Sequence, residues 1–439
     1  MNSTPVSWRL GLAAAIVAVT AAAYLTAGTI DVKLQSLCGV VAFFLIAVLF
    51  SANLRAINWR VVATGLSLQV VLAVVITKVP FVYRGFEVVG NFVAKVLTFT
   101  EGPTATLFGT VWPRPPLALI ILPTVIFVAC AFTILFHLKV LQGIVWVLAK
   151  LMVLLMGKRG VSGAETLSAV ANVFMGQTEA PLIVAPYVAK MTKSELLAIM
   201  IGGMAAIAGG VMAIYISMGA NAVALLATSV MAAPCGLYVA KILQPETETP
   251  LTRGTLTIAN ETGYANVIDA AAAGASEGMK LAINIIAMLI AFTALIVMFN
   301  YLLGQVWTGM TLQIVFGEIF APIAVLMGVD AADVPKVAEL LGIKLVGNEF
   351  LAFDAMTQQY KPGTANGMTD RSYALTTYAL TGFANISSIG ILLGGIGSLA
   401  KDPADQLALR AKLARLGPKA LLGGFLATLM NAAVAGVLL

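Results

Sequence analysis

The sequence predicts an all-α, polytopic membrane protein, and three observations lead to this fold class. Of the 439 residues, 60% are hydrophobic and only 10% are charged, whereas soluble domains carry about 25% charged residues. The mean hydropathy is +0.97, so lipid must cover surface that water could not. The apolar runs are long enough for helices and lack short alternating strands, which excludes an outer-membrane barrel. We therefore expect a multi-pass protein of the cell inner (plasma) membrane.

Runs of about 20 apolar residues, the length of a membrane-spanning helix, recur along the chain. The clearest candidates are residues 10–27, 36–52, 61–79, 117–136, 195–217, 221–241, 281–303 and 417–438. Residues 139–160 are also apolar but end in Lys158-Arg159-Gly160, and residues 372–400 are apolar but broken by glycines and polar side chains. The mixed stretch at residues 84–115 is typical of interfacial helices or a surface loop.

The orientation follows from lysines and arginines in short loops, which favour the cytoplasm. Residues 53–60 contain two arginines, and residues 401–419 contain three lysines and two arginines. This places the N-terminus inside and the C-terminus outside, which requires an odd number of spans. If residues 162–190 and 333–360 re-enter without crossing and residues 311–328 lie in the interface, about nine transmembrane helices remain.

Two apolar segments, residues 162–190 and 333–360, have polar and acidic centres. One lies in each half of the chain, and paired interrupted segments point to a transporter site near the midplane of the bilayer. We divide the chain accordingly. Residues 1–160 are N-terminal helices, mostly scaffold and interfacial; 161–260 hold the first re-entrant hairpin and following helices; 261–330 hold a scaffold helix and an interfacial segment; 331–439 hold the second re-entrant hairpin, a broken helix and the last span.

The first interrupted segment contains the polar triad Gln177-Thr178-Glu179 between Gly176 and Pro181. A charge inside an apolar segment costs roughly 2.5–3.5 kcal/mol unless it is paired or hydrated. Proline opens the helix and frees carbonyls that can bind a cation or a substrate. Glutamine donates and accepts, so it suits the edge of a nucleobase. The alternative is a surface loop with apolar flanks.

The second interrupted segment centres on Asn348-Glu349-Phe350. Glu349 would be another intramembrane carboxylate, and carboxylates accept the paired hydroxyls that sugars present. The alternative is a solvated segment, because Lys344 and Asp354 lie nearby.

A third polar group follows Gly382, where a helix can break. Asn385 and Ser388 are three residues apart and share a helix face, and Phe383 could stack on a ring. The alternative is interhelical hydrogen bonding, which Asn and Ser commonly provide in membranes. The small residues of the stretch 202–211 indicate either close packing or another break at Gly209-Gly210.

Other features carry little chemistry. Three acidic residues, at the expected segment ends or in the interface, are expected to be hydrated: Glu165, Glu195 and Glu318. The three cysteines are widely separated and there is one histidine, so neither a disulfide framework nor a metal cluster is expected. The sequence has no phosphate loop, nucleophile elbow or metal-ligand spacing, which argues against an enzyme.

Six sequence runs resemble the concentrative nucleoside transporter family: GQTEAPL (176–182), TKSEL (192–196), AIAGGV (206–211), NVIDAAAAGAS (266–276), NEF (348–350) and GFANISSIGI (382–391). The likeness extends from about residue 36 to the end. It implies a homotrimer, two re-entrant hairpins and an elevator-like movement of the substrate domain.

The resemblance also implies residue roles. The nucleobase would meet Gln177, Thr178, Glu179 and Val211; the ribose would meet Glu349, Asn385 and Ser388, with Phe383 packed against the nucleoside. Sodium would bind the Asn172 side chain and the carbonyls of Met175, Ala206 and Ile207. One departure is Ala206, where sodium-coupled members often have a serine hydroxyl.

The expected function is a secondary active symporter that imports nucleosides with sodium and needs no cofactor. Proton coupling is the alternative, followed by a channel or a transporter for another polar solute. Purine and pyrimidine nucleosides both remain open as substrates. The expected partners are a nucleoside, membrane lipid and two further copies of the chain, and no nucleic acid.

Overall fold

The computed structural model describes residues 5–109, 117–157, 160–254, 263–400 and 402–439, and this part of the chain is helical without strands. The all-α prediction is therefore confirmed for these residues. Lys158, Arg159 and Lys401, which entered the reasoning above, lie outside them. The α-helices are α1 (Val6–Leu25), α2 (Val32–Leu49), α3 (Trp59–Lys78), α4 (Pro80–Thr98), α5 (Glu101–Phe108), α6 (Leu117–His137), α7 (Val140–Met156), α8 (Gly163–Ala171), α9 (Ala185–Val188), α10 (Lys193–Ala205), α11 (Gly209–Met218), α12 (Ala222–Leu243), α13 (Val267–Val306), α14 (Leu312–Met327), α15 (Val334–Val346), α16 (Glu349–Gln359), α17 (Asp370–Leu380), α18 (Ile386–Gly395) and α19 (Pro403–Leu438). Short 3-10 helices are η1 (Leu54–Ala56), η2 (Ala180–Val184), η3 (Ala331–Asp333) and η4 (Ile396–Leu399).

Seven helical stretches of the described chain are long and apolar enough to cross a membrane: α1, α2, α3, α10 with α11, α12, α13 and α19. Helices α6 and α7 are a further apolar pair, bent by 71° between them. The protein is thus a multi-pass membrane protein. The number of nine spans, the orientation and the four-part division of the chain stay predictions.

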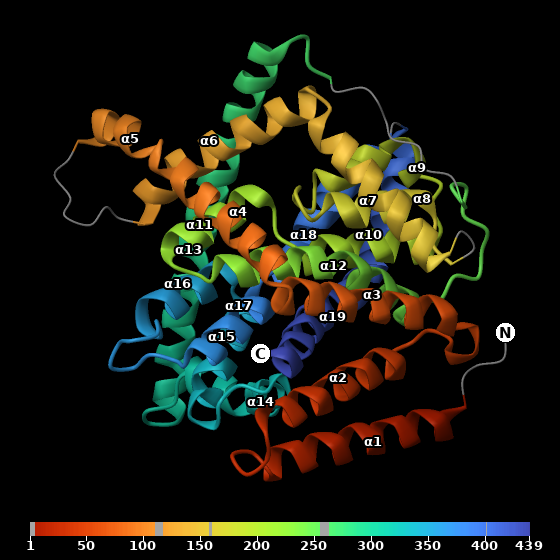
Figure 1. Ribbon diagram of the computed structural model, residues 1–439, viewed down its shortest axis with the longest axis vertical. Coiled ribbons are helices and arrows are strands. Elements are labelled where there is room, and N and C mark those ends of the chain that lie inside the picture. The colour runs from red at the N-terminus through yellow and green to blue at the C-terminus, as the bar shows by residue number, and fades with distance from the viewer. Residues whose placement is uncertain (1–4, 110–116, 158–159, 255–262, 401) are drawn as a thin grey trace.

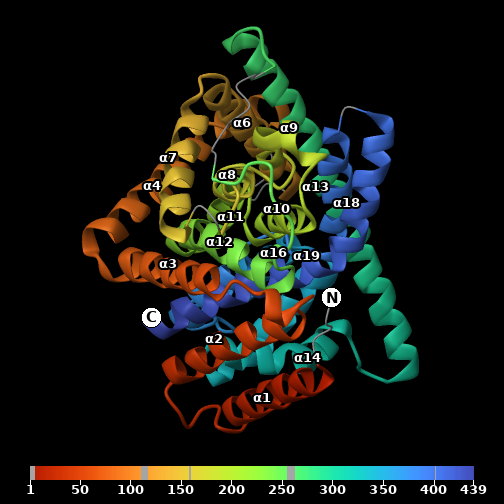
Figure 2. The ribbon, with the colours of Figure 1, turned by 90° about the vertical axis from the view of Figure 1, so that its right-hand side faces the viewer.

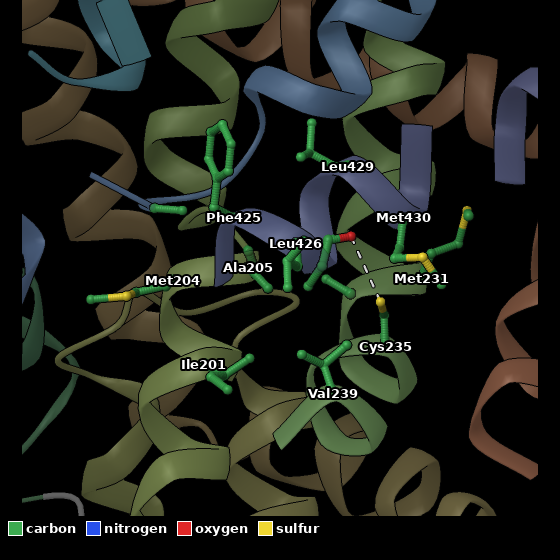
Figure 3. Packing of buried hydrophobic residues seen from close by; sticks show 14 of the residues in the cluster. Ile201, Met204, Ala205, Met231, Cys235, Val239, Phe425, Leu426, Leu429 and Met430 are labelled. Atoms are coloured by element: carbon green, nitrogen blue, oxygen red, sulfur yellow. Dashed lines mark hydrogen bonds between the residues drawn. The ribbon is translucent and has the colours of Figure 1, made fainter. Parts of the chain in front are cut away.

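The centre of the molecule is built from α10, α12 and α19, which pack against one another. Figure 3 shows apolar side chains of the three helices gathered in one region, among them Ala205 of α10, Val239 of α12 and Leu426 of α19. Close approach depends on glycine: a Cβ at Gly423 would lie 2.3 Å from Ile201 Cδ1. Small residues at helix interfaces are the usual means of tight packing in membranes.

The outer helices enclose this centre on different sides. Helix α13 runs along nearly the full height of the molecule and packs on α6 (Figures 1 and 2). Helices α1 and α2 form an outer layer together with α14 (Figure 2). The mixed stretch after residue 80 forms α4 and α5, and α4 packs against α11 and α12.

Two of the expected spans are broken helices, and their breaks meet. One break separates α10 from α11 at residues 206–208, and the other separates α17 from α18 at residues 381–385. Gly382 has φ +109°, and a Cβ there would lie 2.7 Å from the carbonyl oxygen of Met204. Only glycine fits this conformation and this approach without strain. The break expected at Gly382 is confirmed, whereas Gly209 starts α11 and packs against Phe132.

Two acidic residues expected to be hydrated are instead buried, because their surroundings satisfy them. Glu165 and Glu195 each complete a capping box, at the N-termini of α8 and α10. The ammonium of Lys241 lies 2.7 Å from Glu165 Oε2 and donates to Ser194 Oγ at 3.0 Å. The prediction for these two residues was wrong; Glu318 is exposed, and its hydration stays a prediction.

Candidate substrate and cation site

Glu349 is the centre of the first half of the site. It is the first residue of α16, only 6% exposed, and follows Asn348, whose side chain caps the helix by accepting from Leu351 N at 2.9 Å. Two neutral groups donate to its carboxylate: Tyr215 OH at 3.3 Å to Oε1 and Asn385 Nδ2 at 2.8 Å to Oε2. The helix N-terminus adds a favourable dipole. A buried carboxylate is therefore held without an ion pair within 4 Å in the described residues.

Asn385 connects this carboxylate to the break between α17 and α18. Its Oδ1 accepts from Ser388 N at 2.9 Å, which caps α18, and from Ser387 Oγ at 2.7 Å. Ser388 is buried on the first turn of α18, and Phe383 is half-buried in the break. The structure therefore places Asn385 between Glu349 and Ser388, with a hydrogen bond to each.

Tyr215 is a site residue that the sequence analysis missed. It is fully buried on α11, stacks on Phe353 with ring centroids 4.1 Å apart, and meets Phe350 edge-on at 5.6 Å. It is the one tyrosine in the apolar run 195–217. A buried tyrosine hydroxyl usually finds a polar partner, so this residue was a detectable signal.

The first interrupted segment holds buried oxygens without partners. Asn172 ends α8 and is 1% exposed; its Nδ2 donates to Ser168 O at 2.9 Å, but its Oδ1 has no hydrogen-bond partner among the described residues. The same holds for Gln177 Oε1 and for the hydroxyl of Ser168. Ser168 lies one turn before Asn172 on the same face of α8. Sequence reasoning missed it, although this spacing was visible.

These oxygens lie against the break between α10 and α11. Gly209 N donates to Phe174 O at 3.1 Å, and a Cβ at Gly203 would lie 2.8 Å from Gln177 Cβ. In the described residues, no hydrogen bond reaches the carbonyls of Met175, Ala206 or Ile207. The amide, hydroxyl and carbonyl oxygens of this region are thus free to bind a ligand.

The remaining predicted residues lie around these two halves. Thr178 packs against Gly395 of α18, where a Cβ would be 2.5 Å from Thr178 Cγ2. Glu179 is exposed, and its carboxylate lies over Gly176. Val211 is buried in the first turn of α11. The roles of all these residues stay predictions.

The donor types fit an alkali cation better than a transition metal. Within the described ranges, no group of three or more His, Cys, Asp or Glu residues could hold a metal ion. Unwound carbonyls and helix ends at broken helices coordinate sodium in secondary transporters. Two broken helices that meet beside two interrupted segments, with polar side chains at the breaks, are features of a membrane transporter.

Three family profiles match successive parts of the chain. They are the Na+ dependent nucleoside transporter N-terminus (residues 38–111), the nucleoside recognition or Gate profile (118–222) and the Na+ dependent nucleoside transporter C-terminus (224–436). The chain belongs to the concentrative nucleoside transporter family, a family of transporters and not of enzymes.

Individual relatives agree over most of the chain. An uncharacterized transporter of Haemophilus influenzae is 41% identical over 415 residues, which cover 92% of this chain and 97% of the relative. The mouse sodium/nucleoside cotransporter 1 is 38% identical over 423 residues, which cover 92% of this chain but 64% of that longer protein. The solved structure of CNTnw in an inward-facing substrate-bound state is 38% identical, with a TM-score of 0.86 and 92% and 97% of the two chains covered.

Proposed function

We propose that this protein is a secondary active symporter that imports nucleosides and is driven by the sodium gradient. The observation that carries the proposal is the buried Glu349–Asn385 pair at the junction of two helix breaks. The side-chain oxygens of Asn172 and Ser168 lie on the first interrupted segment and have no hydrogen-bond partner among the described residues, which supports the proposal. A polar solute would bind at the Glu349–Asn385 half of the site, and a cation at the Asn172 half.

The Glu349 carboxylate has room for ribose hydroxyls. An ionised carboxylate offers about four acceptor positions, and Tyr215 and Asn385 use one each. Two positions would then accept a pair of neighbouring hydroxyls, with Asn385 and Ser388 alongside. On the opposite side, Gln177, Thr178 and Glu179 would meet the nucleobase, with Val211 and Phe383 packing against the nucleoside.

The coupling cation would satisfy the unpartnered oxygens. Sodium would bind Asn172 Oδ1 and the carbonyls of Met175, Ala206 and Ile207, with the hydroxyl of Ser168 in reach of the same helix face. A bound cation would fasten the first segment to the α10–α11 break and thereby place Gln177. Each ligand then binds better once the other is present, which is the energetic content of coupling.

Proton coupling is the second candidate, because Ala206 offers only its carbonyl to a cation. In that case a carboxylate such as Glu179 or Glu349 would carry the proton. The homotrimer and the elevator-like movement are parts of the same proposal. They are supported by α13, whose 40 residues leave an apolar face largely exposed, and by the likeness to CNTnw, which is also solved as a variant in an outward-facing state (TM-score 0.86).

Uptake of labelled uridine into proteoliposomes tests the proposal, under an inward sodium gradient and, separately, an inward proton gradient. Accumulation with sodium alone supports the sodium symporter. Accumulation with protons alone means that the coupling ion is a proton and not sodium. If several nucleosides fail to accumulate under either gradient, while reconstitution is verified, the nucleoside assignment is refuted.

A further inference from the structure

Lys344 is a buried cation that the proposed site does not use. It lies near the end of α15 with no exposed surface, and no carboxylate of the described residues is within 4 Å of its ammonium. Burying an ammonium is costly unless its protons are satisfied. All three protons find acceptors, and none of the acceptors belongs to α15.

The acceptors lie on two other helices. The ammonium donates to Ala379 O at 2.7 Å and to Thr381 O at 3.4 Å, at the end of α17, and to Thr428 Oγ1 at 3.1 Å on α19. It also lies 5.6 Å from the centre of the Phe425 ring, within the range of a cation–π contact. The last carbonyls of a helix lack partners and carry partial negative charge, so a lysine is well suited to end α17 here.

The helix that Lys344 ends is the one that leads to Asn385. Residues 381–385 form the break between α17 and α18, and Asn385 at its far end donates to Glu349. Glu349 itself follows Lys344 by five residues on the same interrupted segment. The second interrupted segment is therefore hydrogen-bonded to both ends of the break. Lys344 donates to Thr381 at its start, and Glu349 accepts from Asn385 at its end.

We propose that Lys344 is a positioning residue that fixes the break between α17 and α18 against the second interrupted segment, and so presets the Glu349–Asn385 pair for ribose hydroxyls. The inference rests on the proposed function. The positive charge of Lys344 also balances the negative charge of Glu349. Because the ammonium does not contact the carboxylate, the acceptor positions of Glu349 stay open to substrate.

The test compares uridine with 2′,3′-dideoxyuridine, which lacks both hydroxyls that Glu349 would accept. Lys344→Gln should raise the KM for uridine about tenfold and change that for the dideoxy analogue less than about twofold, because only hydroxyl recognition depends on the preset pair. In a Glu349→Gln background, where uptake is too weak for a KM, dissociation constants of the purified protein replace it, and Lys344→Gln should have no further effect on the ratio for the two substrates. A lysine with only a structural role would not show this dependence on Glu349.

A second variant covers the case in which Lys344→Gln does not fold. Thr428→Val removes one acceptor from outside the site and should lower the uridine preference about two- to threefold. Thr376→Val is the matched control, since that buried hydroxyl donates within α17 to Ser372 O at 2.7 Å, and its preference should stay unchanged. Equal changes for both substrates, or none in Thr428→Val, would overturn the inference while the proposed function stands. A wild-type protein that transports no nucleoside would remove both.

Discussion

The side-chain amides of Asn431 and Asn172 are equally buried, yet they end in different surroundings. Asn431 Oδ1 accepts from Gln69 Nε2 at 2.7 Å, and its Nδ2 donates to Thr228 Oγ1 at 3.2 Å; Gln69 Oε1 in turn accepts from Tyr238 OH at 2.8 Å. In this network between α3, α12 and α19, both polar atoms of each amide side chain have a partner on a neighbouring helix. Asn172 Oδ1 has no partner in the part of the chain that the structure describes.

The difference separates polar groups that pair with one another across helices from polar groups that have no partner among the described residues. A closed network gains modest stability from each hydrogen bond, whereas an unpaired buried oxygen costs free energy until something binds it. Residue type does not distinguish the two regions, because both use amides and hydroxyls. The hydrogen-bond partners of each polar atom distinguish them, and single substitutions can test that distinction.

The largest effect is expected for Glu349→Gln. The amide keeps the shape of the side chain but loses the charge that strengthens acceptance of hydroxyls. Concentrative uridine uptake should fall by roughly 100-fold or more, while the protein stays folded and elutes from gel filtration as the wild type does. Normal uptake in proteoliposomes would remove Glu349 from the site.

The matched pair Asn172→Leu and Asn431→Leu tests the comparison directly. Asn172→Leu removes an oxygen without a partner among the described residues and one bond from Nδ2 to Ser168 O, a carbonyl that still accepts from Asn172 N. Stability in sodium-free buffer should therefore change little, while the half-saturating sodium concentration rises about 30-fold, or about 2 kcal/mol. Asn431→Leu leaves Gln69 Nε2 without its acceptor and should cost about 1–3 kcal/mol of stability, seen as a lower melting temperature. Its sodium dependence should be unchanged.

The reverse pattern, with Asn431→Leu altering the sodium dependence and Asn172→Leu only the melting temperature, would show that the unpartnered oxygen does not mark a cation site. Equal loss of stability in both variants would mean that Asn172 is structural as well.

A smaller effect is expected for Tyr215→Phe. The change removes only the hydroxyl that donates to Glu349 Oε1 and leaves the stacked rings of Tyr215 and Phe353 in place. Loss of one such hydrogen bond is worth about 1 kcal/mol, so the KM for uridine should rise about fivefold in the uptake assay. An unchanged KM would mean that Asn385 alone holds the carboxylate.

Much of this site could be predicted from sequence, for a physical reason. Glu349, Asn385 and the triad Gln177-Thr178-Glu179 stand out because charged or amide side chains in apolar runs are costly and therefore informative. Proximity in space was less accessible. Tyr215 meets Glu349 from 134 residues away along the chain, so its hydroxyl could be noticed in the apolar run but its partner could not be named.

The same reasoning explains the errors. Glu165 and Glu195 lie at the starts of helices, where hydration is a reasonable expectation, but Lys241 and two capping boxes satisfy them in the interior. The capping boxes could be read from the spacing Ser162–Glu165 and Thr192–Glu195, whereas the burial of Lys241 depends on helix packing that the sequence does not encode locally. The broken spans followed the same rule: Gly382 was visible, but the meeting of the two breaks required the tertiary structure.

The smallest effect is a gain, expected for Ala206→Ser. The new hydroxyl would add an oxygen beside the Ala206 carbonyl, at the break that the unpartnered Asn172 side chain adjoins. The half-saturating sodium concentration should fall about threefold, the scale of a weak added ligand, in uptake measured over a sodium series. Ala384→Ser, at a buried alanine of the other break, is the control and should leave the sodium dependence unchanged. If Ala206→Ser instead leaves sodium without effect and uptake follows protons, the open oxygens of the first segment bind water rather than the coupling ion.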